Sequence, residues 1–501
     1  MVKGGTRNSS LYLNKKKITK KYKIIMYPTL LKTKAESPAY STPFYVKNLY
    51  DGTNVLEIYG RRNVTPTVAI EYSTDSYSWN TLGTVSGYVK VSHEIPANGI
   101  VYLRAVASSY SYGNADIQIA CTQNHSIGGN IMSLCWGADF VGKTQFYGNY
   151  KYGDNVYQFS YLFSNNKKLI SAENLIIPGT YYGANSLFGL FADCTNLVSG
   201  PSITATKVNR NACNSMFKGC TSLTNLPPMM VSVIEEQGFY EMFRGCTGLV
   251  TAPILNVTSV GPYAMSSMFY GCSGLTNVPD NMLFNINTIY EGGLSQMFEN
   301  CTSLTTAPSL PNLLTTNKGS QFEAMFRGCT SLSIIPNTFV RSIQLTDHMF
   351  ARCFQGCTSL VSVPKNTLNF TTLNKGCYVQ MFKDCTSLTG APDLPATTLP
   401  TGATSYWTSA YGNMFENCTS LTTAPNLPCL NPPAYSYYEM YKGCSNLNNV
   451  SCMATNVSAT SVTENWLSGV AATGTFTTPS STSWTVDSES GIPSGWTRVN
   501  A

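Results

Sequence analysis

Apolar residues recur along most of this chain in a fixed frame that is marked by a cysteine. The marker cysteines are Cys194, Cys220, Cys246, Cys272, Cys301, Cys329, Cys357, Cys385, Cys418 and Cys444. They follow one another in steps of 26, 26, 26, 29, 28, 28, 28, 33 and 26 residues. A period of this size is typical of solenoids, in which each repeat packs mainly on its neighbours. The ten copies therefore predict one continuous solenoid.

Each copy places apolar residues at the marker and at three, four and seven residues before it, as at Cys213, Met216, Phe217 and Cys220. This spacing predicts one face of a short helix. The residue just before every marker is Gly, Asn or Asp, and these residues tolerate a left-handed backbone. We therefore expect each helix to end in a left-handed cap.

A second apolar segment follows each marker and ends at a proline, as from Leu304 through Ala307 to Pro308. It predicts a short extended segment that stacks in parallel on its neighbours. Because proline lacks a backbone donor, these strands should be brief. The frame continues without a cysteine around Asn166 and Val470, as expected of terminal capping repeats.

The repeat motif reads Met-Phe-x-Gly-Cys-Thr-Ser-Leu-Thr-x-Ala-Pro, and residues 297–308 and 414–425 carry it with Asn in place of Gly. The motif resembles the leucine-rich repeats of the BspA-like type, and the resemblance runs from about Phe159 to the end. It implies an α/β solenoid of about 10–12 repeats with short parallel strands and short helices. Such repeats occur in Bacteroidales surface adhesins and in virion proteins of gut Bacteroidales phages, including crAss-like phages.

Residues 39–130 carry short runs of alternating apolar and polar residues, including 55–59, 67–72 and 100–106. Turn-forming residues separate them, and together they predict a small all-β sandwich. Residues 71–75 and 129–134 resemble the N-terminal domain that precedes such repeats in phage and Bacteroidales proteins. We expect the solenoid to span 131–501, with an N-terminal cap at 131–185 and a C-terminal cap at 453–501.

The basic charge of the chain is concentrated at its N-terminus. The net charge is +6, but ten of the 32 Lys and Arg residues precede the first acid, Glu36, which leaves 22 against 26 acids. We predict that residues 1–38 are a basic anchor that orders on another virion protein of the capsid or tail; a disordered, solubilising tail is the alternative. The candidate anchoring residues are Lys15, Lys16, Lys17, Lys20, Lys21, Lys23, Tyr22, Ile24 and Ile25. We expect no nucleic-acid binding, since the segment lacks aromatic interleaving and a recognisable fold.

The 17 cysteines do not form a metal-binding pattern. Ten occupy the marker column, where a free thiol packs as a small hydrophobe. Adjacent coils lie about 4.8 Å apart, so disulfide pairing stays open beside the reduced state that we expect. No Cys-x-x-Cys pair occurs, and we expect neither a metal nor a cofactor.

The sequence carries no recognisable catalytic constellation. The three histidines, His93, His125 and His348, stand apart from any nucleophile motif, and the acids are scattered. We therefore expect no enzyme. No secretion signal and no span of 18 apolar residues is visible. This predicts synthesis in the host bacterial cytoplasm without a signal peptide, no membrane association and a place on the virion surface.

The longest step between markers, from Cys385 to Cys418, contains extra residues at 400–410. Insertions into a solenoid project from one face, often the binding face. The candidate ligand-binding residues are therefore Tyr406 and Trp407, with Tyr435 and Tyr438 one repeat later. The alternative is that these rings pack on their own repeats.

These features favour a structural and adhesive phage virion protein, a head fibre or tail fibre whose solenoid projects to bind host or mucosal glycans or proteins. Homo-oligomers are compatible with this role. A bacterial cell-surface adhesin is the alternative, and it requires an export signal. A polysaccharide depolymerase is the third hypothesis, and it requires clustered carboxylates on one face of the solenoid.

Overall fold

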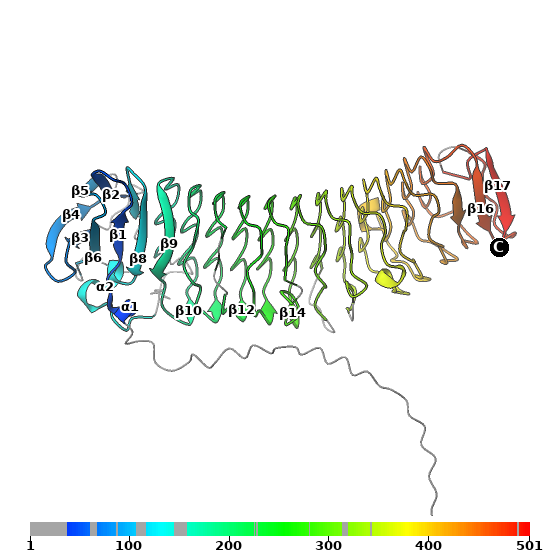
Figure 1. The fold of residues 1–501 in the computed structure, drawn as a ribbon. Coiled ribbons are helices and arrows are strands. Elements are labelled where there is room, and N and C mark those ends of the chain that lie inside the picture. The colour runs from blue at the N-terminus through cyan, green and yellow to red at the C-terminus, as the bar shows by residue number, and fades with distance from the viewer. Residues whose placement is uncertain are drawn as a thin grey trace, which may run out of the picture.

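The computed structural model describes residues 38–60, 68–86, 89–106, 117–144, 158–224, 226, 229–279, 281–312, 319–340, 343–487 and 490–501. The nine candidate anchoring residues of the basic N-terminal segment lie outside these described residues. The described chain forms an N-terminal β-sheet region followed by a solenoid of about 12 turns, which together make one elongated rod (Figure 1).

The N-terminal region consists of two sheets. After α1 (Pro38–Ser41), the strands are β1 (Tyr45–Asn48), β2 (Asn54–Gly60), β3 (Val68–Ser73), β4 (Asn80–Val85), β5 (Lys90–Ile95), β6 (Ile100–Ala105), β7 (Ile117–Cys121) and β8 (His125–Asn130). A six-stranded sheet has the order β4-β3-β6-β1-β8-β9, and a three-stranded sheet has the order β5-β2-β7. Alternate residues of β2 and β6 are buried, as the alternating sequence pattern predicts.

The larger sheet continues into the solenoid. β8 pairs in parallel with β9 (Leu169–Ile176), the first strand after the segment that contains α2 (Ser133–Trp136) and η1 (Gly137–Asp139). The N-terminal region therefore covers the first coil through a shared sheet, and the two parts are continuous in Figure 1.

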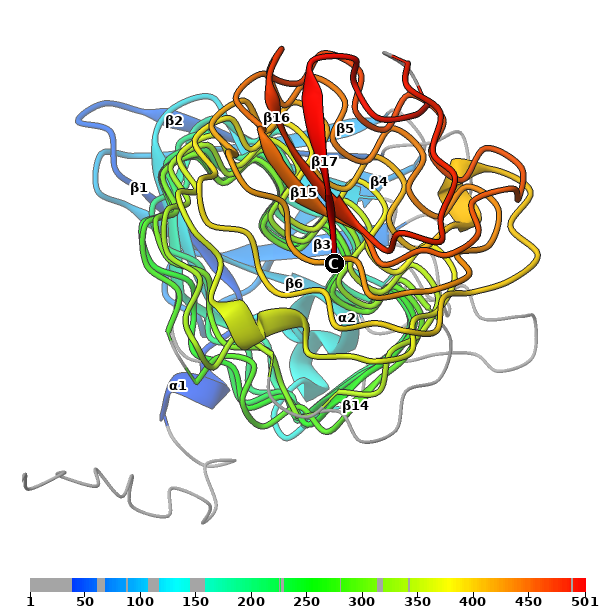
Figure 2. The same ribbon diagram turned by 90° about the vertical axis from the view of Figure 1, so that its right-hand side faces the viewer.

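The strands of the solenoid are mostly very short, but most of them lie outside the predicted segments. From the marker to the proline, most coils form only isolated bridges, such as Thr306 with Ile334, whereas two-residue strands lie between the proline and the next spiral. β10 (Tyr181–Tyr182), β11 (Lys207–Val208), β12 (Val233–Ile234), β13 (Ser259–Val260) and β14 (Thr288–Ile289) stack in parallel as one sheet. β15 (Asn449–Ser451), β16 (Gly474–Thr478) and β17 (Trp496–Asn500) form a second parallel sheet at the C-terminal end. The remaining elements are η2 (Lys365–Leu368) and η3 (Tyr406–Thr408). Figure 2, turned by 90°, shows the coils superposed along the rod.

The prediction of short helices before each marker is wrong, because these segments form spirals of successive turns. The amide of Met216 donates to the carbonyl of Cys213 in its own coil (3.2 Å), whereas the amide of Phe217 donates to Met242 in the next coil (2.9 Å). In the same segment φ is positive at Asn211 and Ser215 (53° and 55°). An α-helix directs its interior amides along its own axis. Here alternate amides point sideways, because the stacked coil offers them a carbonyl.

The left-handed conformation before the marker is confirmed at all ten positions. Gly219 has φ of 73°, and the same residue of the other copies has φ between 59° and 74°, including Asn300, Asn417 and Asp384. The predicted inward face is also confirmed: Cys213, Met216, Phe217 and Cys220 are fully buried. The spacing thus identified the buried side chains correctly although the backbone is not helical.

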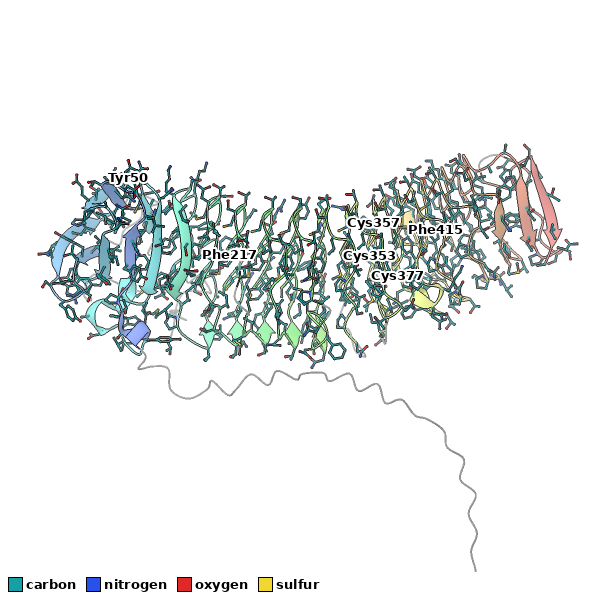
Figure 3. The ribbon with its side chains drawn as sticks, in the orientation of Figure 1. Tyr50, Phe217, Cys353, Cys357, Cys377 and Phe415 are labelled. Atoms are coloured by element: carbon teal, nitrogen blue, oxygen red, sulfur yellow. The ribbon has the colours of Figure 1, made fainter. Side chains whose placement is uncertain are left out.

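A column of stacked rings fills the centre of the solenoid. It runs through Phe163, Phe191, Phe217, Phe243, Phe269, Phe298, Phe326, Phe354, Phe382, Phe415 and Tyr441, with ring centroids 5.3–5.7 Å apart. Phe217 and Phe415 lie inside the rod in Figure 3. We call this column the phenylalanine ladder. Because each ring contacts the ring before and after it, the core is continuous from coil to coil.

The marker cysteines form a second buried column beside the phenylalanine ladder. Each marker Sγ donates a hydrogen bond of 2.9–3.2 Å to the carbonyl oxygen of the ladder phenylalanine in the preceding coil, as from Cys220 to Phe191. All 17 cysteines are buried free thiols. The thiols therefore link neighbouring coils by hydrogen bonds.

Candidate functional site

The structure brings the four candidate ligand-binding residues together. Tyr406 and Trp407 lie on η3, which the insertion forms, and Tyr435 and Tyr438 lie on the next coil. The rings of Tyr406 and Tyr438 stack with centroids 5.6 Å apart, and Tyr435 lies 6.1 Å from Tyr438. Tyr406 and Trp407 meet edge to face at 6.5 Å. We call these four residues the aromatic cluster.

Two residues that the sequence did not indicate complete the surroundings of Trp407. The imidazole of His348 stacks on the indole at 5.4 Å, and the guanidinium of Arg352 lies 5.0 Å from the indole centroid. Arg352 also forms an ion pair with Glu323. Gly376, with φ of 62°, leaves space for this packing, since a Cβ there would overlap the His348 ring. His348 and Arg352 belong to an earlier coil. Because they are far from Trp407 in the sequence, the sequence alone does not indicate that they contact it.

The rings of the aromatic cluster are only partly exposed to solvent. Tyr406 is 37% exposed, and Trp407, Tyr435 and Tyr438 are half-buried. Stacking covers a face of Tyr406, Tyr438 and Trp407. The cluster therefore packs across neighbouring coils, and one face of each of these three rings is covered.

A row of ion pairs lies on the coils beside the aromatic cluster. The amide Nδ2 of Asn413 donates to Glu416 and to Glu439, both at 2.8 Å. Lys383 pairs with Glu416 at 2.7 Å, and Lys442 pairs with Glu439 at 2.8 Å. The hydrogen bond to Glu439 raises the pKa of Lys442. This network joins successive coils, and each of its two carboxylates has a lysine partner.

The three histidines of the chain stand in separate places. His125 is buried in β8, where desolvation lowers its pKa to about 4. The ring centroid of His93 lies 4.1 Å from that of Tyr72, and burial lowers the pKa of His93 as well. Among the acids, Glu235 and Glu236 form surface ion pairs with Lys207 and Arg210. Within the described part of the chain, no histidine is therefore hydrogen-bonded to the side chain of a Ser, Cys, Asp or Glu residue.

The buried thiols lack the features of reactive cysteines. Burial raises the pKa of the marker thiols, to about 12 for Cys194, Cys272, Cys329 and Cys444. Because the thiolate is the nucleophile and the metal ligand, such thiols stay protonated at neutral pH. The described residues contain no group of three or more His, Cys, Asp or Glu that could hold a metal ion. Among the same residues, no helix is long and apolar enough to cross a membrane.

Comparison with known proteins adds no relative. No protein-family model matches the chain, and no curated protein is significantly similar to it. The resemblance to BspA-like repeats accordingly rests on the motif that the chain itself repeats ten times.

Proposed function

We propose that this chain is a structural and adhesive protein of a phage particle, a head fibre or tail fibre of the BspA-like type. In this proposal the basic N-terminal segment attaches to capsid or tail proteins. The solenoid projects from the virion surface and binds host or mucosal glycans or proteins. The chain has no catalytic role and is made in the host cytoplasm.

The observation that supports this proposal is the uninterrupted rod. The phenylalanine ladder continues from Phe163 to Tyr441 without a missing ring. Coils joined by buried rings, thiol hydrogen bonds and backbone hydrogen bonds resist bending. A stiff rod carries a binding surface away from its attachment point, which is what a fibre requires.

The surface of the chain also suits adhesion. Charged residues make up 12% of the sequence, and Tyr50, Tyr77 and Tyr181 are among the exposed tyrosines. A neutral, hydroxyl-rich surface keeps many polar groups available for uncharged ligands. Binding to such a surface depends little on salt concentration, because salt screens interactions between charges.

Deletion of residues 2–38 tests the proposal. Particles produced with the full chain and with the deletion are purified, and the occupancy of the chain is measured by quantitative mass spectrometry and immunogold labelling. We expect the deletion to abolish incorporation while circular dichroism and the melting temperature of the purified solenoid stay unchanged. Full occupancy of the truncated chain would contradict the anchor. Labelling of intact bacteria in the absence of particles would favour the cell-surface adhesin instead.

A further inference from the structure

An open hollow lies between the coil of Cys385 and the coil of Cys418. It has a volume of about 540 Å³. One wall contains Thr397, Thr398 and Leu399, and the other contains Cys429, Leu430 and Asn431. A smaller hollow of about 340 Å³ adjoins it and shares Pro428. All side chains that line the larger hollow are uncharged.

The hollow stands where a step of the backbone hydrogen-bond ladder is absent. At this level of the solenoid, two consecutive amides usually donate to one carbonyl of the preceding coil. Ser232 and Val233 donate to Thr206 (2.8 and 3.1 Å), and Thr397 and Thr398 donate to Thr371 (3.0 and 3.2 Å). Thr455 and Asn456 donate to Leu430 in the same way (2.8 and 3.4 Å). Within the described backbone, no such bond runs from Leu430 or Asn431 to Thr397.

The insertion lies between the open part of the ladder and a part in which the two coils are hydrogen-bonded. At the end of the insertion, the amides of Gly376 and Tyr378 donate to Ser409 and Ala410 of the next coil (2.8 and 3.2 Å). The extra residues at 400–410 leave the wall of the solenoid and form η3, the orange coiled ribbon at the outer edge in Figure 2. The two coils are thus joined by backbone hydrogen bonds from Gly376 onward, whereas no such bond joins them at the hollow within the described backbone.

We propose that this hollow binds a short segment of a neutral glycan. The inference rests on the adhesive function proposed above and assigns its ligand site. The hydroxyl groups of Thr397, Thr398 and Thr401 and the amide of Asn431 match the hydroxyl groups of a sugar. Leu430, which is 53% exposed, and the proline rings offer apolar surface to its C–H groups. The volume is in the range of small-ligand sites, about 300–1,000 Å³.

The charges and the prolines near the hollow argue against two other classes of ligand, acidic polysaccharides and extended peptides. The only acid at the adjoining hollow is Asp393, which lies 3.6 Å from Lys365. The lining thus offers no unpaired cation to an acidic polysaccharide. An extended peptide that completed the ladder would need a row of backbone donors, and Pro428 and Pro433 remove donors from one wall. A neutral glycan meets neither difficulty.

A printed array that carries neutral, sialylated and sulfated glycans and uncharged peptides tests the inference with the full chain. The variant Thr398→Trp fills the hollow. Thr372→Trp is the matched control. Thr372 is an exposed residue of the preceding coil, and it pairs with Thr398 at a step where the ladder is formed. We expect the wild type and the control to bind neutral glycans with affinities within about twofold of each other. We expect Thr398→Trp to weaken this binding by about tenfold or more, with an unchanged circular dichroism spectrum.

Each other outcome overturns the assignment. Equal binding by all three proteins would place the site elsewhere on the rod. Loss of binding in Tyr438→Ala but not in Thr398→Trp would place it at the aromatic cluster. Binding confined to acidic glycans or to peptides, or no binding at all, would refute the neutral glycan. The particle-incorporation measurement is independent of the array, so attachment to the virion can hold while this site fails.

Discussion

Phe44 stacks on Phe163 with ring centroids 5.7 Å apart and an angle of 24° between the ring planes. Phe44 precedes β1 in the N-terminal region, and Phe163 is the first ring of the phenylalanine ladder. The backbone amide of Phe44 donates to the hydroxyl of Ser133 at 2.9 Å, which fixes the ring from the side of the N-terminal region. The two regions therefore share one hydrophobic core across their junction.

Replacing Phe44 by Ala should uncouple the two regions. Removal of a buried ring costs about 3–5 kcal/mol, and here it removes the contact that joins two cores. We expect differential scanning calorimetry to show a lowered first transition that separates from the transition of the solenoid. Tyr50→Ala, at a position that is 46% exposed, is the control and should leave the trace unchanged. A single transition at the wild-type temperature in Phe44→Ala would contradict the shared core.

The solenoid core should be sensitive to truncation at every coil. Phe298 stacks between Phe269 and Phe326 and is fully buried, and Leu304 is 1% exposed. We expect Phe298→Ala and Leu304→Ala to lower the free energy of unfolding by about 2–5 kcal/mol each in urea titrations. Thr305 is exposed on the same coil, so Thr305→Ala should change stability little. The inward face would be wrong if the threonine variant were the damaging one.

The marker cysteines should act as hydrogen-bond donors in the core. Cys301 donates from Sγ to the carbonyl of Phe269 at 3.1 Å. Cys301→Ala removes this bond and leaves a small cavity, so we expect a loss of about 1 kcal/mol and no change in ligand binding. Alkylation of the denatured chain followed by mass spectrometry should find most of the ten marker thiols free. A count near zero would show that the column pairs as disulfides.

The solenoid and its buried columns follow from the sequence because a repeated unit must bury the same side chains in each coil. The turn spiral does not follow. Offsets of three, four and seven residues place side chains on one face of a helix and equally on one face of this spiral. The only local signal is a left-handed backbone conformation at every fourth position. Ser215 adopts it with φ of 55°, although serine is not a residue type that favours this conformation.

The aromatic cluster illustrates the same limit at the level of the site. The insertion indicates Tyr406 and Trp407, because extra residues must leave the coil. It does not indicate His348 and Arg352, which reach Trp407 only through the stacking of coils. The hollow at Thr398 depends on which hydrogen bonds the insertion removes, and this can be read only from the paired backbone.

His125 should make the junction sensitive to acid. Its Nδ1 lies 3.0 Å from the carbonyl oxygen of Gln123, and its Nε2 lies 3.1 Å from Nδ2 of Asn166 on the first coil. A neutral ring satisfies both contacts if Nδ1 donates and Nε2 accepts. A second proton would set an N–H of the ring against the N–H of Asn166. Burial, the main cause, lowers the pKa of His125 from 6.5 to about 4.

The sign of the pH dependence follows from this lowered pKa. Between pH 6.5 and 4 the unfolded chain binds a proton at His125 that the folded chain does not bind. Stability should therefore fall as pH falls through this window, by up to about 3 kcal/mol. Urea unfolding at pH 7, 5.5 and 4.5 measures this loss. The variant His125→Gln should lose less stability over the same interval, while His93→Gln should retain most of the dependence. An identical acid loss in wild type and His125→Gln would assign the dependence to other groups.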